Sequence, residues 1–152
     1  MLGGYTLMNK PHVYDKAKWH TDGKFPKDLK QYQAFVHTGM FVSWLIEHDM
    51  ISPDFVAETS RFRSSELTGT QVYELWDGAL VDDMLTDEGN RFAQSYFDFQ
   101  SGQFLKDYEE VFPSAPTLYH VQDTRENYER IRDRINQRYD DWKKSPPPNK
   151  IE

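Results

Sequence analysis

Apolar side chains gather most densely between Gln33 and Met50, in the stretch QAFVHTGMFVSWLIEHDM. This stretch runs for about five helical turns without a proline, and its first charged residue is Glu47. Steps of about 100° per residue place apolar side chains on every side of such a helix, so we expect it to be buried on more than one face. The pattern predicts a central helix around which the chain packs. Its charged last turn argues against a membrane span.

One-sided apolar patterns predict further helices along the rest of the chain, and polar capping residues mark where several of them begin. The predicted helices cover residues 53–59, 68–76, a run that starts at Thr86, residues 103–112, and a last run from Asp123 or Thr124 to Trp142. Residues 61–65 are expected to form a polar connection. Only Thr117–Val121 has the character of a strand. The sequence therefore predicts a mainly α fold with at most one minor short strand.

The length of 152 residues fits one compact domain. We expect residues 1–10 to be flexible, residues 11–144 to form a single helical domain, and the proline-rich residues 145–152 to be a disordered tail. Cysteine is absent, which excludes disulfides and thiolate metal sites and is compatible with a reducing compartment. Residues 1–9 lack the basic and apolar regions of a secretory signal, so we expect a cytoplasmic protein.

The formal net charge of −7 is concentrated in one part of the chain. Residues 77–110 hold nine acids against two basic residues, Arg91 and Lys106. This segment alone therefore carries a charge of −7, and the rest of the chain has no net charge. Such a run is often only a solvated face. It disfavours nucleic acid, whose phosphates need clustered cations, and it suits a basic protein partner. The residues expected to bind such a partner are Trp76, as an aromatic anchor, with Asp77, Asp82, Asp83, Asp87 and Glu88.

A second group of residues could form a pocket. Trp19 and His20 adjoin each other before a predicted loop, and two further members belong to one stripe of the central helix. The candidate pocket residues are Asp15, Trp19, His20, His37 and Trp44. The commoner arrangements are an aromatic side chain that anchors an N-terminal arm and a hydrogen-bonded core histidine. His37 and His48 lie about 16 Å apart along the helix, too far to ligate one metal ion.

Familiar catalytic motifs are absent from the sequence. It has no glycine-rich phosphate loop, no GxSxG, no HExxH, no dinucleotide fingerprint and no aspartate-rich calcium loop. Asp82 and Asp83 are adjacent, so on a helix their side chains point about 100° apart and need further ligands to hold a cation. The sequence therefore predicts no cofactor and no metal, and an enzyme is the less favoured class.

Four segments resemble an uncharacterised bacterial domain family that carries YDxAxWH…FP and DML…EGN…FA…YF motifs. They are YDKAKWH at 14–20, FP at 25–26, AFVHTGMFVSWLIEHDMIS at 34–52 and LTGTQVYELWDGALVDDMLTDEGNRFAQSYF at 67–97. The resemblance implies a small, acidic, cytoplasmic bacterial protein and a link to immunity proteins of toxin systems. It assigns no activity. From the charge and the rejected membrane span, we expect neither a nucleic-acid nor a membrane partner.

Charge and resemblance together favour a non-enzymatic binding protein that neutralises a cognate basic toxin through its acidic surface. The alternative is a small hydrolase or modification-reversing enzyme that uses the candidate pocket. An oligomeric adaptor stays open, and the sequence makes no prediction of oligomeric state.

Overall fold

The central helix of the structure is α3 (Val36–Glu47), which follows the 3-10 turn η1 (Gln31–Phe35). The structure is a computed structural model that describes residues 11–100 and 102–145. Every side chain of α3 from Val36 to Ile46 is buried. The prediction of a central helix buried on more than one face is confirmed, although the α-helix begins and ends about three residues inside the predicted range.

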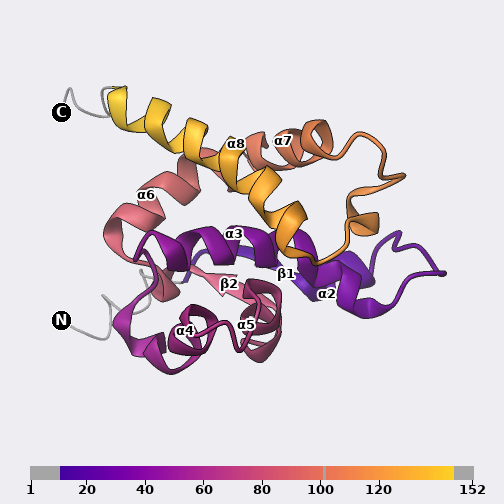
Figure 1. The fold of residues 1–152 in the computed structure, drawn as a ribbon, viewed down its shortest axis with the longest axis horizontal. Helices are drawn as coiled ribbons and strands as arrows, with labels where there is room; N and C mark the ends of the chain where they lie inside the picture. Colours follow the sequence, from indigo (N-terminus) through magenta and orange to yellow (C-terminus); the bar gives the residue numbers. More distant parts are fainter. Residues whose placement is uncertain (1–10, 101, 146–152) are drawn as a thin grey trace.

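The described residues form a mainly α fold, as the sequence predicts. In Figure 1, α3 crosses the middle of the molecule, with α8 on one side and the pair α4 and α5 on the other. The remaining α-helices are α2 (Ala17–Thr21), α4 (Val56–Arg63), α5 (Gly69–Leu75), α6 (Asp87–Tyr96), α7 (Gln103–Val111) and α8 (Arg125–Lys144). Because α3 has neighbours on both sides, a polar face on this helix would be buried away from water.

Capping side chains set several helix starts. Thr68 and Gln71 form a reciprocal capping box at α5, and Thr86 accepts the backbone N–H of Gly89 at α6. Thr124 accepts the N–H of Asn127 and so begins α8. These starts agree with the predicted ones. The polar connection predicted at residues 61–65 is wrong in its first half, because α4 continues through Arg63.

A small antiparallel sheet joins β1 (Val13–Lys16) to β2 (Ala79–Val81), with Lys16 opposite Ala79. The sequence analysis did not identify either strand. Its predicted strand at 117–121 is wrong: the chain turns there through η4 (Leu118–His120), because the Oγ1 of Thr117 accepts the backbone N–H of Tyr119. Two further 3-10 turns are η2 (Pro53–Phe55) and η3 (Asp82–Met84).

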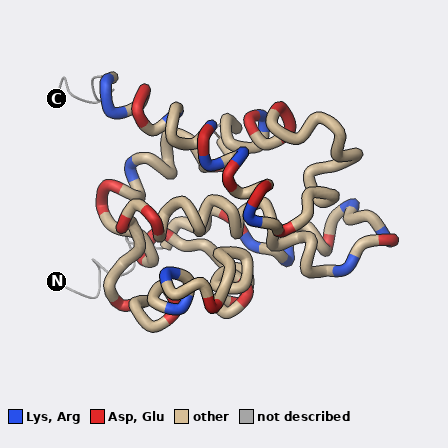
Figure 2. Tube along the Cα trace, in the orientation of Figure 1, with Lys and Arg blue, Asp and Glu red and all other residues tan. Residues whose placement is uncertain are grey.

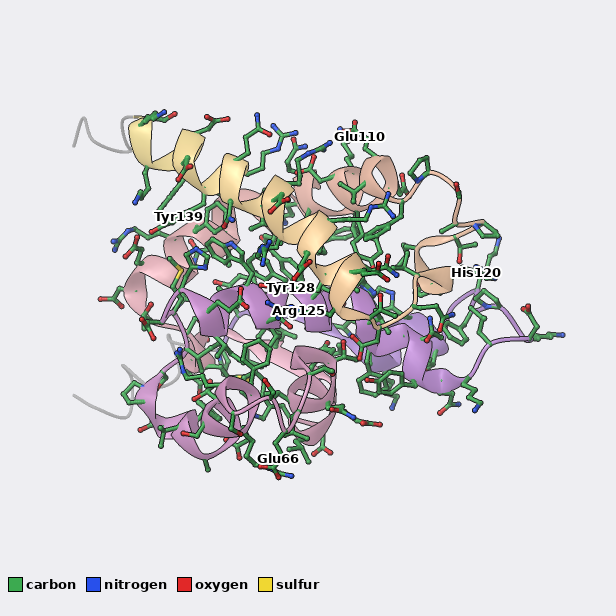
Figure 3. The ribbon with its side chains drawn as sticks, in the orientation of Figure 1. Glu66, Glu110, His120, Arg125, Tyr128 and Tyr139 are labelled. Atoms are coloured by element: carbon green, nitrogen blue, oxygen red, sulfur yellow. The ribbon has the colours of Figure 1, made fainter. Side chains whose placement is uncertain are left out.

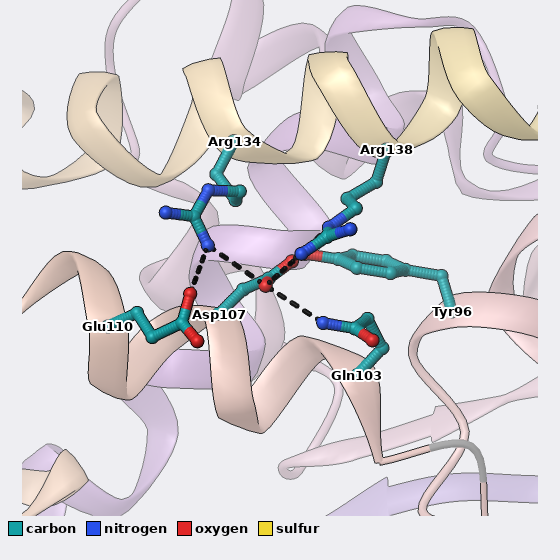
Figure 4. Close-up of polar contacts among 6 residues, drawn as sticks. All are labelled: Tyr96, Gln103, Asp107, Glu110, Arg134 and Arg138. Carbon is teal, nitrogen blue, oxygen red and sulfur yellow. Dashed lines mark hydrogen bonds and ion pairs between the residues drawn. The ribbon is translucent and has the colours of Figure 1, made fainter.

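Asp107 on α7 is a fully buried carboxylate that ties α7 to α8 (Figure 4). The guanidinium of Arg138 donates two hydrogen bonds of 2.9 Å to it, and Arg134 donates one of 3.0 Å. The Tyr96 hydroxyl (2.7 Å) and the Gln103 amide (3.0 Å) complete the shell. One member of the acidic run is therefore an internal anchor, whose charge is compensated by two arginines.

Within the described residues, no helix has both the length and the apolar composition needed to cross a membrane. The predicted flexible segment 1–10 and residues 146–152 of the predicted tail lie outside the described residues. The last described helix, α8, ends at Lys144, directly before Ser145 and the prolines.

Candidate functional site

Asp15, His20 and His37 come together where β1, α2 and the first turn of α3 meet. One ligating atom from each of the three side chains lies within 4.8 Å of the other two. The backbone at Lys16 is still extended, and α2 begins at the next residue, which brings His20 back over Asp15. The imidazole rings of His20 and His37 meet edge to face, with centroids 4.6 Å apart.

The Asp15 carboxylate is the centre of this group, which we call the Asp15 cluster and define as Asp15, His20, His37, Thr38, Tyr73 and Tyr119. One carboxylate oxygen lies 2.8 Å from Nε2 of His20. The other accepts the hydroxyl of Thr38 at 2.6 Å and, more weakly, that of Tyr73 at 3.4 Å. Nδ1 of His20 lies 2.7 Å from the Tyr119 hydroxyl. A continuous chain thus runs from carboxylate through imidazole to phenol.

Burial controls the ionisation of these groups. Burial raises the pKa of Asp15, but the hydrogen bond to His20, the charges of the two histidines and the hydrogen bond from Thr38 lower it by more, so its pKa lies below the usual value. Burial lowers the pKa of His37 to about 4, against the opposing charge of Asp15. Asp15 is therefore an anion at neutral pH, next to a neutral imidazole at His37. Nδ1 of His37 has no hydrogen-bond partner among the described residues.

Two of the predicted pocket residues lie elsewhere. The side chain of Trp19 is 53% exposed, so it is not an anchor packed into the core. Trp44 is fully buried two turns along α3 from His37, where it donates its Nε1–H to Asn136 and stacks on His48. Of the five predicted pocket residues, Asp15, His20 and His37 lie together, and Trp19 and Trp44 do not join them.

The sequence analysis missed Thr38, Tyr73 and Tyr119. Tyr73 lies in the helix predicted at 68–76 without a role of its own, and Tyr119 was placed in a strand. Each comes from a different element, so no local spacing connects them. The one local signal was Thr38 directly after His37, at the polar start of an otherwise apolar helix.

Most residues of the predicted acidic surface are solvent-accessible. Asp83, Asp87 and Glu88 are exposed and Asp82 is half-buried, on η3 and the first turn of α6. Figure 2 shows acidic positions predominating around α6, whereas acidic and basic positions alternate along α8. Among the described residues, none of these four carboxylates forms an ion pair with a lysine or arginine, although Glu88 accepts the Tyr139 hydroxyl.

The structure places Trp76 and Asp77 apart from these four carboxylates. The Trp76 side chain is only 9% exposed and packs edge to face on Phe55, so it is not an aromatic anchor on the surface. Its Nε1 has no hydrogen-bond partner among the described residues. Asp77 is exposed but precedes β2, whereas Asp82 follows that strand, so the two lie at opposite ends of it.

A cleft of about 660 Å³ opens between α3, α5 and the start of α8. Arg125 and Tyr128 lie at its α8 side and Glu66 on the opposite side (Figure 3). Its charges are already paired: Arg125 contacts Glu129 at 3.1 Å, and Asp123 accepts three hydroxyl groups, from Tyr32, Thr68 and Thr70. The cleft does not include the Asp15 cluster.

Comparison with known proteins shows that the chain matches one protein family. A family model described as "Domain of unknown function (DUF7832)" matches residues 13–121, which include every member of the Asp15 cluster and the acidic residues of η3 and α6. Searches of curated proteins and of solved structures gave no match.

Proposed function

The chain belongs to the DUF7832 family, whose function is unknown, and from its own surface we propose that it is a non-enzymatic binding protein for a basic protein partner. The observation that carries this proposal is the set of carboxylates at the β2–α6 junction that form no ion pair with a lysine or arginine of the described residues. We call Asp82, Asp83, Asp87 and Glu88 the acidic surface. Elsewhere in the same acidic run, Asp107 and Glu110 are neutralised by arginines of α8, whereas these four carboxylates are close in sequence and form no ion pair with a lysine or arginine among the described residues.

Hydrogen bonds fix the backbone that carries the acidic surface. The side-chain amide of Asn90 donates to the backbone oxygen of Asp82 at 2.9 Å, and the backbone N–H of Thr86 donates to the backbone oxygen of Met50, three residues after α3, at 2.9 Å. A partner that binds these carboxylates would not have to order this backbone first, which lowers the entropic cost of association. Fixed acidic groups also speed the encounter with a basic partner.

The partner that fits best is the basic active-site face of a bacterial toxin, which would make this chain its immunity protein in the cytoplasm of the producing cell. An acidic protein that covers such a face both blocks substrate and gains from charge complementarity. Since Trp76 is buried, contact close to Asp77 would come from Leu75, whose side chain is exposed.

Reversing the charge of the acidic surface is expected to weaken partner binding at least about tenfold and to flatten its salt dependence. The variant is Asp82→Lys with Asp83→Lys. A matched control is Asp22→Lys with Asp28→Lys, which makes the same charge change in the exposed loop at the far end of the molecule from α6 (Figure 1).

The measurement is capture from a lysate of the source organism on immobilised protein at low and high salt, followed by affinity measurement with the isolated partner. A basic protein retained by the wild type and by the loop control, but lost by the double variant, supports the proposal. Equal retention by all three proteins, or no basic protein at all, contradicts it.

The Asp15 cluster favours a second function, a small hydrolase or modification-reversing enzyme. If Nε2–H of His20 donates to Asp15, Nδ1 is free to accept the proton of Tyr119, as in a carboxylate–imidazole–hydroxyl relay. We expect Tyr119→Phe and His20→Gln to abolish turnover of generic ester and phosphate substrates, with His120→Gln unchanged as the control. Turnover that survives both substitutions, or no turnover by the wild type, contradicts this function.

A further inference from the structure

We propose that Asp15, His20 and His37 bind one divalent transition-metal ion of the zinc type. Two imidazoles and one carboxylate form a donor set that suits Zn²⁺ and Fe²⁺, and it leaves coordination positions for water or another ligand. Imidazole donors make Mg²⁺ and Ca²⁺ poor candidates, since these ions prefer oxygen ligands. The proposal is independent of the acidic surface and of any toxin partner.

The spacing of the donor atoms is close to that of a coordination shell. Ligands about 2.1 Å from one ion lie about 3.0 Å apart at right angles and about 3.4 Å apart in a tetrahedron. Oδ1 of Asp15 lies 2.8 Å from Nε2 of His20, and Oδ2 lies 3.7 Å from Nε2 of His37. All three donors lie within 4.8 Å of one another, so the histidine rings would have to move closer together to complete the shell.

The distance between Asp15 and His37 is the strongest argument for a metal ion. At 3.7 Å it is too long for a hydrogen bond, and both groups are buried. If Nε2 of His37 carries no proton, its lone pair faces a carboxylate oxygen, which is unfavourable unless a cation lies between them. If Nε2 carries the proton, 3.7 Å is too long for that proton to be donated to Asp15, and Nδ1 of His37 has no hydrogen-bond partner among the described residues. A shared metal ion satisfies both Nε2 and the carboxylate.

A second layer of contacts orients two of the three ligands. The Thr38 hydroxyl holds one oxygen of Asp15, and the Tyr119 hydroxyl lies 2.7 Å from Nδ1 of His20, the nitrogen that stays free when Nε2 binds a metal. Partners of this kind fix the ring and the carboxylate of metal ligands in proteins. The three ligands also come from β1, α2 and α3, so an ion would connect three elements.

The test is metal binding by protein without a histidine tag that has been stripped with a chelator. We expect one Zn²⁺ per chain by calorimetry, one Co²⁺ per chain with visible absorption bands, and a higher melting temperature with either ion. Asp15→Asn and His20→Gln are expected to weaken the affinity by about 100-fold or more, as loss of a ligand should exceed the effect of losing a second-layer contact.

His120→Gln is the matched control, because His120 follows Tyr119 directly but bonds only to Thr117 among the described side chains. It should bind metal like the wild type. His20 is partly exposed, so its variant is expected to fold, and far-ultraviolet circular dichroism checks this. Wild-type protein that binds neither ion, or a folded His20→Gln variant that binds with wild-type affinity, overturns the proposal and leaves the three side chains as a structural network.

Discussion

Replacing Gly39 by alanine is expected to lower the free energy of unfolding by about 3 kcal/mol. A β-carbon at this position would lie 2.4 Å from both Cα and Oγ1 of Thr70, far inside van der Waals contact. Helix α5 cannot simply retreat, since Thr70 also donates its hydroxyl to Asp123 at 3.0 Å. On the opposite side of the contact, a β-carbon on Gly69 would lie 2.5 Å from the carbonyl oxygen of Gly39. The backbones of α3 and α5 are thus in direct contact.

Helix propensity alone predicts the opposite result, namely that Gly39→Ala raises the free energy of unfolding. At an exposed position within a helix, a change from glycine to alanine stabilises by about 1 kcal/mol. The steric clash must therefore exceed that gain. Gly23→Ala is the control, because its β-carbon would meet its nearest neighbour, the carbonyl oxygen of Trp19, at an ordinary 3.4 Å.

Thermal and urea unfolding of the two variants measure the difference. For a chain of this size, about 3 kcal/mol corresponds to a melting temperature lower by roughly 6–12 °C, while the control should stay within about 2 °C of the wild type. A Gly39→Ala protein with wild-type stability would mean that α3 and α5 separate at little cost, contrary to their close contact in the structure.

Much of the fold follows from local pattern. The apolar stretch identifies α3 as the central helix, and the threonines at positions 68 and 86 identify the starts of α5 and α6. These features depend on residues within one or two helical turns. The sheet was missed because its strands have three and four residues and pair across more than sixty residues of sequence.

Charge was harder to predict than apolar periodicity. The sequence analysis counted Asp107 only among the nine acids of residues 77–110, yet its side chain points into the structure, because two arginines of α8 reach it there. Trp76 was expected on the surface and is buried against Phe55. In both positions the outcome depends on a partner distant in sequence, which periodicity within one helix does not report.

The Asp15 cluster also shows that periodicity within one helix does not predict contacts between distant residues. Asp15, His20 and His37 were named together from their chemistry, and the structure does bring them together. Trp44 was added because it belongs to the same stripe of α3 as His37, but two helical turns separate them, and it joins the aromatic core with Phe92 and Tyr139. A shared helix face places residues in one direction without placing them at one site.

Replacing Asp107 by asparagine is expected to lower the free energy of unfolding at pH 7 by about 3 kcal/mol, the lower end of the cost of breaking a buried ion pair. The lower end applies because the side chains of Arg134 and Arg138 are 27% and 38% exposed and can regain water, whereas Asp107 is completely buried. Asparagine keeps the shape but leaves two guanidinium groups without their shared anion (Figure 4).

The loss should also depend on pH, which separates the charge from the shape of the side chain. Burial raises the pKa of Asp107, but hydrogen bonds from Arg138, Tyr96 and Gln103 lower it by more, so the folded pKa lies below the usual value. A carboxylate of this kind stabilises the fold above its unfolded pKa of about 4, and its contribution is lost as the pH falls through the folded value. Urea unfolding from pH 7 to pH 2 should therefore show the wild type and Asp107→Asn converging below pH 4.

Glu110→Gln is the control for this prediction. Glu110 pairs with the same Arg134 at 2.9 Å, but its side chain is 64% exposed, so we expect a loss of about 0.5 kcal/mol or less. An Asp107→Asn difference that stays constant down to pH 2 would show that the cost comes from altered packing. A difference as small as that of Glu110→Gln would show that the arginines are equally stable in water. Only a large loss that disappears in acid identifies the ionised carboxylate as the group that fixes α7 to α8.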